Sequence, residues 1–200
     1  MGIFFIADTH FCHANIIKYC NRPFSSVSEM DETIIRNWNL AVGLSDTVYH
    51  LGDFGFVNLN RLNEIAKELN GIIHLIRGNH DHDNKLHALT WRFKEIVDRA
   101  VIKVPDVDTQ SGQRVIVLDH YALRVWDRKH YGSWHFAGHS HGACKEILPQ
   151  SIEGGLCCDV GVDVWGFRPI GYEEIRQIML QKQSKIAALR ISDISPGLVL

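Results

Sequence analysis

Residues 3–10 read IFFIADTH, an apolar run that ends at two polar side chains, Asp8 and His10. A short run of β-forming apolar residues predicts a strand that is buried on both faces. The same arrangement returns four times further along the chain. Apolar runs at 48–51, 72–76, 115–118 and 135–137 each stop at a turn that contains Asp, Asn or His. We therefore expect five buried strands with polar residues at their carboxyl ends.

Segments with helical periodicity separate the first three of these strands. Apolar residues share one helix face over 30–42, where Ser28 is the expected N-cap, and another over 59–69. A third helix is predicted over 172–181, and the tail at 184–200 carries apolar residues but no assignable element. Strands that alternate with helices at this spacing indicate parallel βαβ units and an α/β fold.

Length and composition fit one domain over residues 1–200. Hydrophobic residues make up 46% and charged residues 22% of the chain, which is ordinary for a globular protein. The formal net charge is −2, so a nucleic-acid partner is not favoured. The five cysteines form no C-x-x-C pair, and no apolar run resembles a signal peptide or a membrane span. We expect a cytoplasmic protein without a membrane anchor, and its oligomeric state is left open.

The polar residues after the strands are of the types that bind metal ions. Ligand sites in α/β proteins form at the carboxyl ends of the strands, so these residues are expected to converge. Asp and Asn also serve as turn and capping residues, and each one taken singly favours that interpretation. Taken as an ordered set they predict a metal site. Its candidate ligands are Asp8, His10, Asp53, Asn79, His120, His139 and His141.

The number and chemistry of the candidates constrain the metal. Seven ligands are too many for one ion and suit two ions about 3.5–4 Å apart that share a carboxylate. A mixture of carboxylate, amide and imidazole ligands suits Mn, Fe or Zn better than Mg alone. We expect two divalent metal ions, with Mn²⁺ favoured and Fe, Zn or Ni as alternatives.

These residues resemble the motifs of the calcineurin-like metallophosphoesterase superfamily. The resemblance rests on D-x-H at 8–10, G-D at 52–53, G-N-H-D at 78–81, His120, and G-H-x-H at 138–141, in that order. Two further stretches resemble small single-domain members from bacteria and phages. They are D-T-H-F-x-H-x-N-I-I-x-Y-x-N-R-P-F at 8–24 and G-V-D-V-W at 161–165. The resemblance implies a four-layer αββα sandwich, in which two mixed β-sheets are flanked by helices.

The resemblance also implies a role for each residue of the site. One ion would be held by Asp8, His10 and His141, and the other by Asn79, His120 and His139. Asp53 would bridge both ions, and His80 would face the leaving group as a general acid. The implied reaction is hydrolysis of a phosphate ester by direct attack of a metal-bridging hydroxide.

The substrate is less well defined by the sequence. A small or nucleotide-type phosphodiester is favoured, a phosphomonoester is the alternative, and a non-catalytic scaffold with this fold is less favoured. The Ser/Thr phosphatase branch follows its G-D motif with Asp and Arg. Here Asp53 is followed by Phe54-Gly55-Phe56, which argues against protein phosphatase activity.

Three residues are candidates for substrate contacts: His13, Arg22 and Arg124. Each of them can also be read as an ordinary surface side chain. Asp119 precedes a proposed ligand and would repel an anionic substrate unless it points away. The carboxylate that would orient His80 is not identified, and Asp81 and Asp83 are the candidates.

Overall fold

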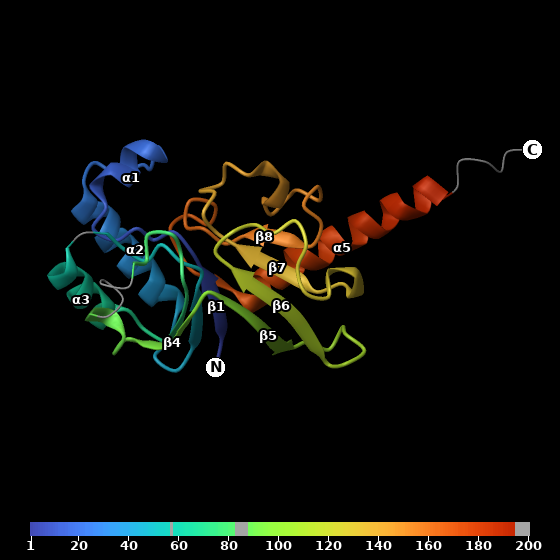
Figure 1. The fold of residues 1–200 in the computed structure, drawn as a ribbon, viewed down its shortest axis with the longest axis horizontal. Helices are drawn as coiled ribbons and strands as arrows, with labels where there is room; N and C mark the ends of the chain where they lie inside the picture. The colour runs from blue at the N-terminus through green and yellow to red at the C-terminus, as the bar shows by residue number, and fades with distance from the viewer. Residues whose placement is uncertain (57, 83–87, 195–200) are drawn as a thin grey trace, which may run out of the picture.

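The computed structural model describes residues 1–56, 58–82 and 88–194, and it describes 190–194 by their backbone alone. The strands form two mixed sheets (Figure 1). The first has the order β4-β3-β2-β1-β9, formed by Phe93–Val97, Ile72–Ile76, Thr47–His50, Ile3–Ile6 and Ile170–Gly171. The second has the order β5-β6-β7-β8, formed by Arg99–Pro105, Gln113–Asp119, Trp134–Ala137 and Cys157–Asp159.

Three helices cover the outer face of the first sheet. They are α1 (Ala14–Tyr19), α2 (Val27–Ala41) and α3 (Leu59–Glu68). Their apolar faces form one core with strand residues such as Val48 and Ile73. The predicted helix over 30–42 begins earlier than expected, because Ser26 is the N-cap and accepts a hydrogen bond from the amide of Glu29. The N-cap prediction of Ser28 was therefore wrong by two positions.

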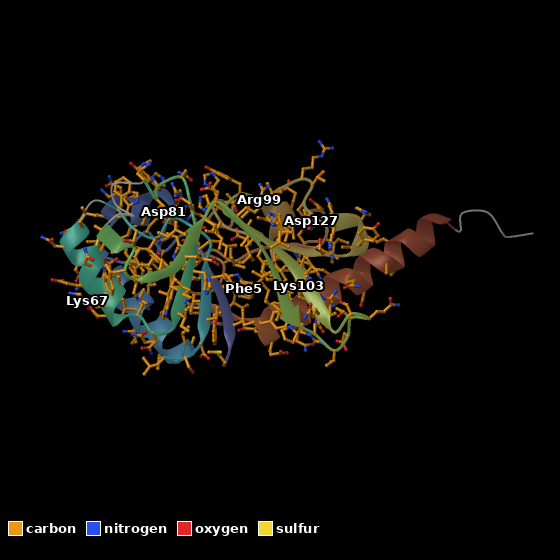
Figure 2. The ribbon with its side chains drawn as sticks, turned by 60° about the horizontal axis from the view of Figure 1, so that its bottom comes forward. Phe5, Lys67, Asp81, Arg99, Lys103 and Asp127 are labelled. Carbon is orange, nitrogen blue, oxygen red and sulfur yellow. The ribbon has the colours of Figure 1, made fainter. Side chains whose placement is uncertain are left out.

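A second core fills the space between the two sheets. Phe5 from β1 lies in the middle of the molecule in Figure 2 and packs edge to face against Phe136 from β7, with ring centroids 4.9 Å apart. Central strands such as β1, β6 and β7 are apolar on successive residues because they are covered on both faces. The last helix, α5 (Tyr172–Ile194), adds Ile175 and Met179 to this core.

The outer face of the second sheet is covered mainly by irregular chain. The short 3₁₀ helices η1 (Lys129–Tyr131) and η2 (Lys145–Ile147) lie in these connections, and Trp126 and Ile147 pack against the sheet. The structure confirms the α/β fold with two mixed sheets flanked by helices. Within the described residues, no helix is both long enough and apolar enough to cross a membrane.

Helix α5 is longer than the predicted helix over 172–181 and includes residues 184–194 of the unassigned tail. The remaining tail, 195–200, lies outside the described residues. In Figure 1 the far half of α5 extends away from the sheets. Its nearer part lies against the edge strand β8, where the buried Lys182 ammonium donates a 2.6 Å hydrogen bond to the Cys157 carbonyl.

Candidate metal centre

The carboxyl ends of strands from both sheets meet where the two sheets adjoin. Beyond β1, Ala7 pairs with the chain that follows β8, since its amide donates to Val160 and its carbonyl accepts from Val162 at 3.1 and 3.0 Å. Gly138, after β7, comes so close that a Cβ there would lie 2.5 Å from the Cβ of Ala7. The first glycine of the G-H-x-H stretch is thus required by the contact between the sheets.

A similarly close contact joins the turns after β2 and β3. A Cβ on Gly78 would collide with the backbone and carboxylate of Asp53. The carboxylate of Asp81 accepts hydrogen bonds from the amides of Asp53, Phe54 and Gly78 at 2.7–3.0 Å. Asp81, a candidate partner of His80, therefore holds two ligand-bearing turns together. The other candidate, Asp83, lies outside the described residues.

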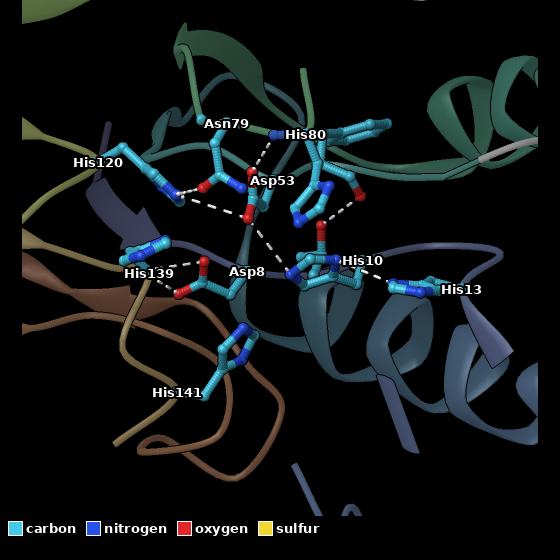
Figure 3. Close-up of polar contacts among 12 residues, drawn as sticks. Asp8, His10, His13, Asp53, Asn79, His80, His120, His139 and His141 are labelled. Carbon is cyan, nitrogen blue, oxygen red and sulfur yellow. Dashed lines mark hydrogen bonds and ion pairs between the residues drawn. The ribbon is translucent and has the colours of Figure 1, made fainter. Parts of the chain in front are cut away.

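The seven predicted ligands surround one small space, and Figure 3 shows most of their contacts. Two groups of three have ligand atoms within 4.8 Å of one another. The first group is Asp8, His10 and His141, and the second is Asp53, His120 and His139. The carbonyl oxygen of the Asn79 amide lies 3.0 Å from Nε2 of His120, beside the second group. Each group therefore combines residues from the first sheet with residues from the second.

Asp53 lies between the two groups. Its Oδ2 is 3.4 Å from Nε2 of His10 and 3.5 Å from Nε2 of His120. Its Oδ1 accepts a 2.9 Å hydrogen bond from the amide of His80, which fixes the carboxylate (Figure 3). One carboxylate oxygen thus faces a histidine of each group, as a bridging ligand requires.

The protonation of His120 indicates that a cation fits between these groups. Its Nδ1 lies 2.7 Å from the Leu51 carbonyl, which can only accept, so Nδ1 carries the proton. Burial lowers the pKa of His120, and the neutral ring then has no proton on Nε2. That bare nitrogen faces the oxygens of Asp53 and Asn79, which are acceptors as well. Three atoms with lone pairs, Nε2 of His120 and the oxygens of Asp53 and Asn79, therefore lie close together with no proton between them, as the ligands of a metal ion do.

His10 and Asp8 give the same indication. Nε2 of His10 is buried, and among the described residues it has no hydrogen-bond partner. Burial, followed by the nearby His141, lowers the pKa of His10, so its ring stays neutral. Burial, followed by Asp159 and Asp53, raises the pKa of Asp8. Bound cations would remove the electrostatic cost of ionised Asp8 and Asp53 beside each other.

The backbone is strained at most of the ligands. A positive φ is uncommon for residues other than glycine and costs on the order of 1–3 kcal/mol when it is strained. Five of the seven predicted ligands adopt it: Asp8 at 58°, His10 at 49°, Asp53 at 58°, His139 at 68° and His141 at 48°. Strain concentrated on one set of polar residues points to a functional site rather than to ordinary turns.

Arg22, a candidate for a substrate contact, lies behind the site in the interior of the protein. It is buried, and its guanidinium forms two 2.8 Å hydrogen bonds with Asp163 and donates to the carbonyls of Asp8 and Thr9. These partners occupy its donors, so the prediction of a substrate contact for Arg22 was wrong. The residue instead fixes the turn that follows β1.

Asp163 is a site residue whose role the sequence did not reveal. Its Oδ2 accepts a 2.7 Å hydrogen bond from Nδ1 of His141, which leaves Nε2 of that ring to face the centre. Burial alone would raise its pKa, but the hydrogen bonds from His141 and Arg22 hold the pKa of Asp163 below its usual range. A carboxylate behind a ligating histidine is the usual second partner in metal sites. Only its place in the G-V-D-V-W segment could have drawn attention to it.

The remaining candidates lie at different distances from the centre. His80 lies at the rim with its ring centroid 5.4 Å from that of His10. His13 stacks on Phe56 at 4.2 Å, and its Nδ1 is 3.3 Å from Nδ1 of His10. Arg124 is exposed, and no described contact joins its side chain to the site. Asp119 turns away from the centre.

Asp119 is bound by its neighbours on the far side of His120. Its carboxylate accepts a 2.6 Å hydrogen bond from Nε of Arg99 and a 2.8 Å hydrogen bond from the amide of Tyr121. The negative charge that followed β6 in the sequence is therefore compensated. It does not add to the charge of the two ligand groups.

Comparison with other proteins gives relatives over almost the whole chain. No protein-family model matches the sequence. The uncharacterized protein MJ1445 of Methanocaldococcus jannaschii is 34% identical, over 88% of this chain and 90% of that protein. The gene 66 protein of Mycobacterium phage L5 is 27% identical, over 88% and 92%. The crystal structure of AQ665 from Aquifex aeolicus, a protein of unknown function, matches with a TM-score of 0.66 and 26% identity, over 88% and 98%.

Proposed function

We propose that this chain, which belongs to the same family as the Methanocaldococcus jannaschii protein MJ1445, is a cytoplasmic metal-dependent phosphoesterase. Its motifs resemble those of the calcineurin-like metallophosphoesterases. The observation that carries the proposal is the position of Asp53, one oxygen of which lies 3.4 Å from Nε2 of His10 and 3.5 Å from Nε2 of His120, an imidazole from each ligand group. Two divalent ions, with Mn²⁺ favoured, fit the mixed carboxylate and imidazole surroundings.

The residues that would hold the ions follow from the two groups. Asp8, His10 and His141 would hold one, and Asn79, His120 and His139 the other, with Asp53 shared. When bound, the ions would supply Lewis-acid activation of water and would neutralise charge on the phosphate oxygens. Leu51 and Asp163 orient the imidazoles of His120 and His141 by accepting their Nδ1 protons.

His80 supplies the proton for the leaving group in this proposal. It belongs to neither ligand group, yet its amide is bonded to the shared carboxylate of Asp53. A substrate phosphate above Asp53 would therefore lie within reach of the imidazole. A protonated imidazole can donate to the ester oxygen as the bond to phosphorus breaks. A scaffold without catalysis would not need this histidine beside a full set of ligands.

Phosphodiesters are the favoured substrates. A monoester dianion requires more positive charge around its terminal oxygens than a diester monoanion does. Arg22 is occupied by Asp163, and Arg124 is exposed without a described contact to the site. The Phe54-Gly55-Phe56 stretch after Asp53 supplies no cation either. Apart from the metal ions, the described site thus supplies little positive charge, which suits the single charge of a diester better than the double charge of a monoester.

The test compares bis(4-nitrophenyl) phosphate with 4-nitrophenyl phosphate on the same Mn²⁺-loaded protein near neutral pH. The leaving group is shared, and a metal-only reaction corrects for intrinsic reactivity. We expect a higher corrected kcat/KM for the diester. A tenfold corrected preference for the monoester, equal to about 1.4 kcal/mol of transition-state discrimination, would replace the phosphodiesterase by a phosphatase. Metal-loaded protein that turns over neither ester would end the proposal.

A further inference from the structure

A cavity adjoins the metal centre on the side of His120. Its volume is about 510 Å³, within the range of small-molecule sites, and its lining includes Arg77, Asn79, Arg99, Tyr121 and Leu123. Asn79 belongs to both places, because its amide oxygen also lies 3.0 Å from Nε2 of His120. In Figure 2 Arg99 and Asp81, which holds the ligand turns, both lie along the upper edge of the molecule. A ligand at the centre can therefore continue into this cavity.

The aromatic ring of Tyr121 lines the cavity on the side of the metal centre. Tyr121 packs edge to face against His120 and His139, with ring centroids 5.0 and 4.7 Å apart. These contacts fix the ring, while 45% of the residue stays exposed. A fixed and partly exposed aromatic ring is a stacking surface for a planar group. Leu123 adds a second apolar contact to the lining.

The charges around the cavity are balanced. Arg99 contacts Asp119 through Nε at 2.6 Å, and Arg77 contacts Asp98 at 3.4 Å. Because each arginine is matched by an aspartate, the cavity has no excess positive charge to attract a second anion. The guanidinium of Arg99, 55% exposed, offers donors, and the carboxylate of Asp98, 90% exposed, offers acceptors. An uncharged heteroaromatic edge carries both kinds of partner.

We infer that this cavity binds the base of a nucleotide whose phosphate lies at the metal centre. Tyr121 would stack on the base, and Arg99 and Asp98 would bind its polar edge. The inference rests on the proposed function for the place of the phosphate and narrows the substrate class to esters of nucleotides. Stacking of this kind is typically strong enough to change affinity by roughly tenfold or more.

The test measures binding, so it does not depend on turnover. Calorimetric titration of Mn²⁺-loaded protein gives the Kd of adenosine 5′-monophosphate and of ribose 5-phosphate, which has a hydroxyl group in place of the base. We expect the nucleotide to bind at least tenfold more tightly, and Tyr121→Ala to remove most of this advantage. Tyr121→Phe keeps the ring and should keep the advantage. Tyr131→Ala is the matched control, because Tyr131 lies on η1 and is 80% exposed.

Three results would overturn the inference. One is equal affinity for the two ligands, and another is a nucleotide advantage that Tyr121→Ala leaves intact. The third is tighter binding of ribose 1,5-bisphosphate than of the nucleotide with loss in Arg99→Ala, which would make the cavity an anion site. Turnover of bis(4-nitrophenyl) phosphate, measured on the same protein, judges the phosphoesterase separately. If the protein turns over the diester but binds the nucleotide and ribose 5-phosphate equally, the phosphoesterase proposal stands and the base site is rejected. If it binds the nucleotide more tightly but turns over no ester, only the nucleotide site stands.

Discussion

Asp53 is the residue on which both ligand groups depend, because one of its oxygens faces a histidine of each group. Asp53→Asn keeps the shape of the side chain and removes the charge. We predict that this variant loses most of its bound metal and its phosphoesterase activity together. Metal content by mass spectrometry and turnover of bis(4-nitrophenyl) phosphate check the prediction. The control is Asp127→Asn, because that side chain is 58% exposed.

Substitution of a ligand shared by two ions should release both ions, whereas substitution of a ligand of one ion should release only that ion. If Asp53→Asn retained two tightly bound ions and near-normal turnover, its bridging role would be refuted. Loss of one ion alone would assign Asp53 to a single group.

His80 can distinguish an effect on catalysis from an effect on metal binding, because it lies at the rim of the metal centre and belongs to neither ligand group. We predict that His80→Ala retains both ions and that kcat falls by roughly 10²–10⁴-fold, the usual contribution of a general acid. The loss should be larger for an alkyl leaving group than for 4-nitrophenolate, which departs without a proton. Measured kcat values for both leaving groups test this. His130→Ala, exposed on η1, is the control.

An equal loss for the two leaving groups would give His80 a different task. It would then bind the phosphate rather than protonate the leaving oxygen. A loss of metal in His80→Ala would instead make it a ligand.

At the scale of elements, the ends of the strands were predictable and the partners of their residues were not. The apolar run of β3 and the ligand that follows it, Asn79, are local features of the sequence. The bond between Arg22 and Asp163 joins residues 141 positions apart, so no local pattern indicates it. Arg22 therefore looked exposed in sequence although the fold buries it.

The short strands were missed for the same reason. β8 has three residues and β9 has two, so neither is long enough to show a period of its own. They are strands because of their neighbours: β8 pairs with β7, and β9 pairs antiparallel with β1. The helix over 172–181 was predicted from its periodicity, and its continuation was not. The α5 residues that join the core between the sheets, such as Ile175 and Met179, lie in its first part, so the periodicity is clear only there.

Helix α5 is attached to the hairpin of β5 and β6 through Asp106, which is 4% exposed. Its carboxylate accepts hydrogen bonds from Arg114 and Tyr172 at 3.0 and 3.1 Å and from Arg176 at 3.2 Å. Burial alone would raise its pKa, but these bonds and the amide of Asp108 lower the pKa of Asp106 to about 2. The folded state therefore prefers the ionised carboxylate more than the unfolded chain does.

This preference predicts how stability changes with pH. A lowered pKa stabilises the folded state above the unfolded value of about 3.9, and the contribution is lost as the pH falls from there toward 2. Asp106→Asn should lower the free energy of unfolding by about 1–2 kcal/mol or more at pH 5, and by less at pH 3. Urea denaturation of metal-free protein at both values checks this, with Asp127→Asn as the control. A deficit that is the same at both pH values would contradict it.

At the scale of the whole molecule, bound ions should stabilise the fold. The two ligand groups hold carboxylates and strained backbone next to one another, and a ligand that binds only the folded state adds to its stability. At a free metal concentration 100 times Kd the gain is about 2.7 kcal/mol for one site. A chelator should then lower Tm by roughly 5–10 °C in a domain of this size. Calorimetric scans with and without EDTA measure it, and Asp53→Asn should show little response.

Each ligand group takes residues from both sheets, so the metal centre is complete only after both sheets have folded against each other. Asp8 and His139, joined by hydrogen bonds of 2.8 and 3.1 Å, are 131 positions apart in the chain. A nascent chain that has made only the strands β1 to β4 therefore holds an incomplete set of ligands for either ion. Contacts of such long range require the loops between them to close first, which slows their formation. The amount of metal bound during refolding therefore reports the fraction of molecules in which the strand ends of both sheets are already in contact. A chain that lacks the second sheet has no complete metal site.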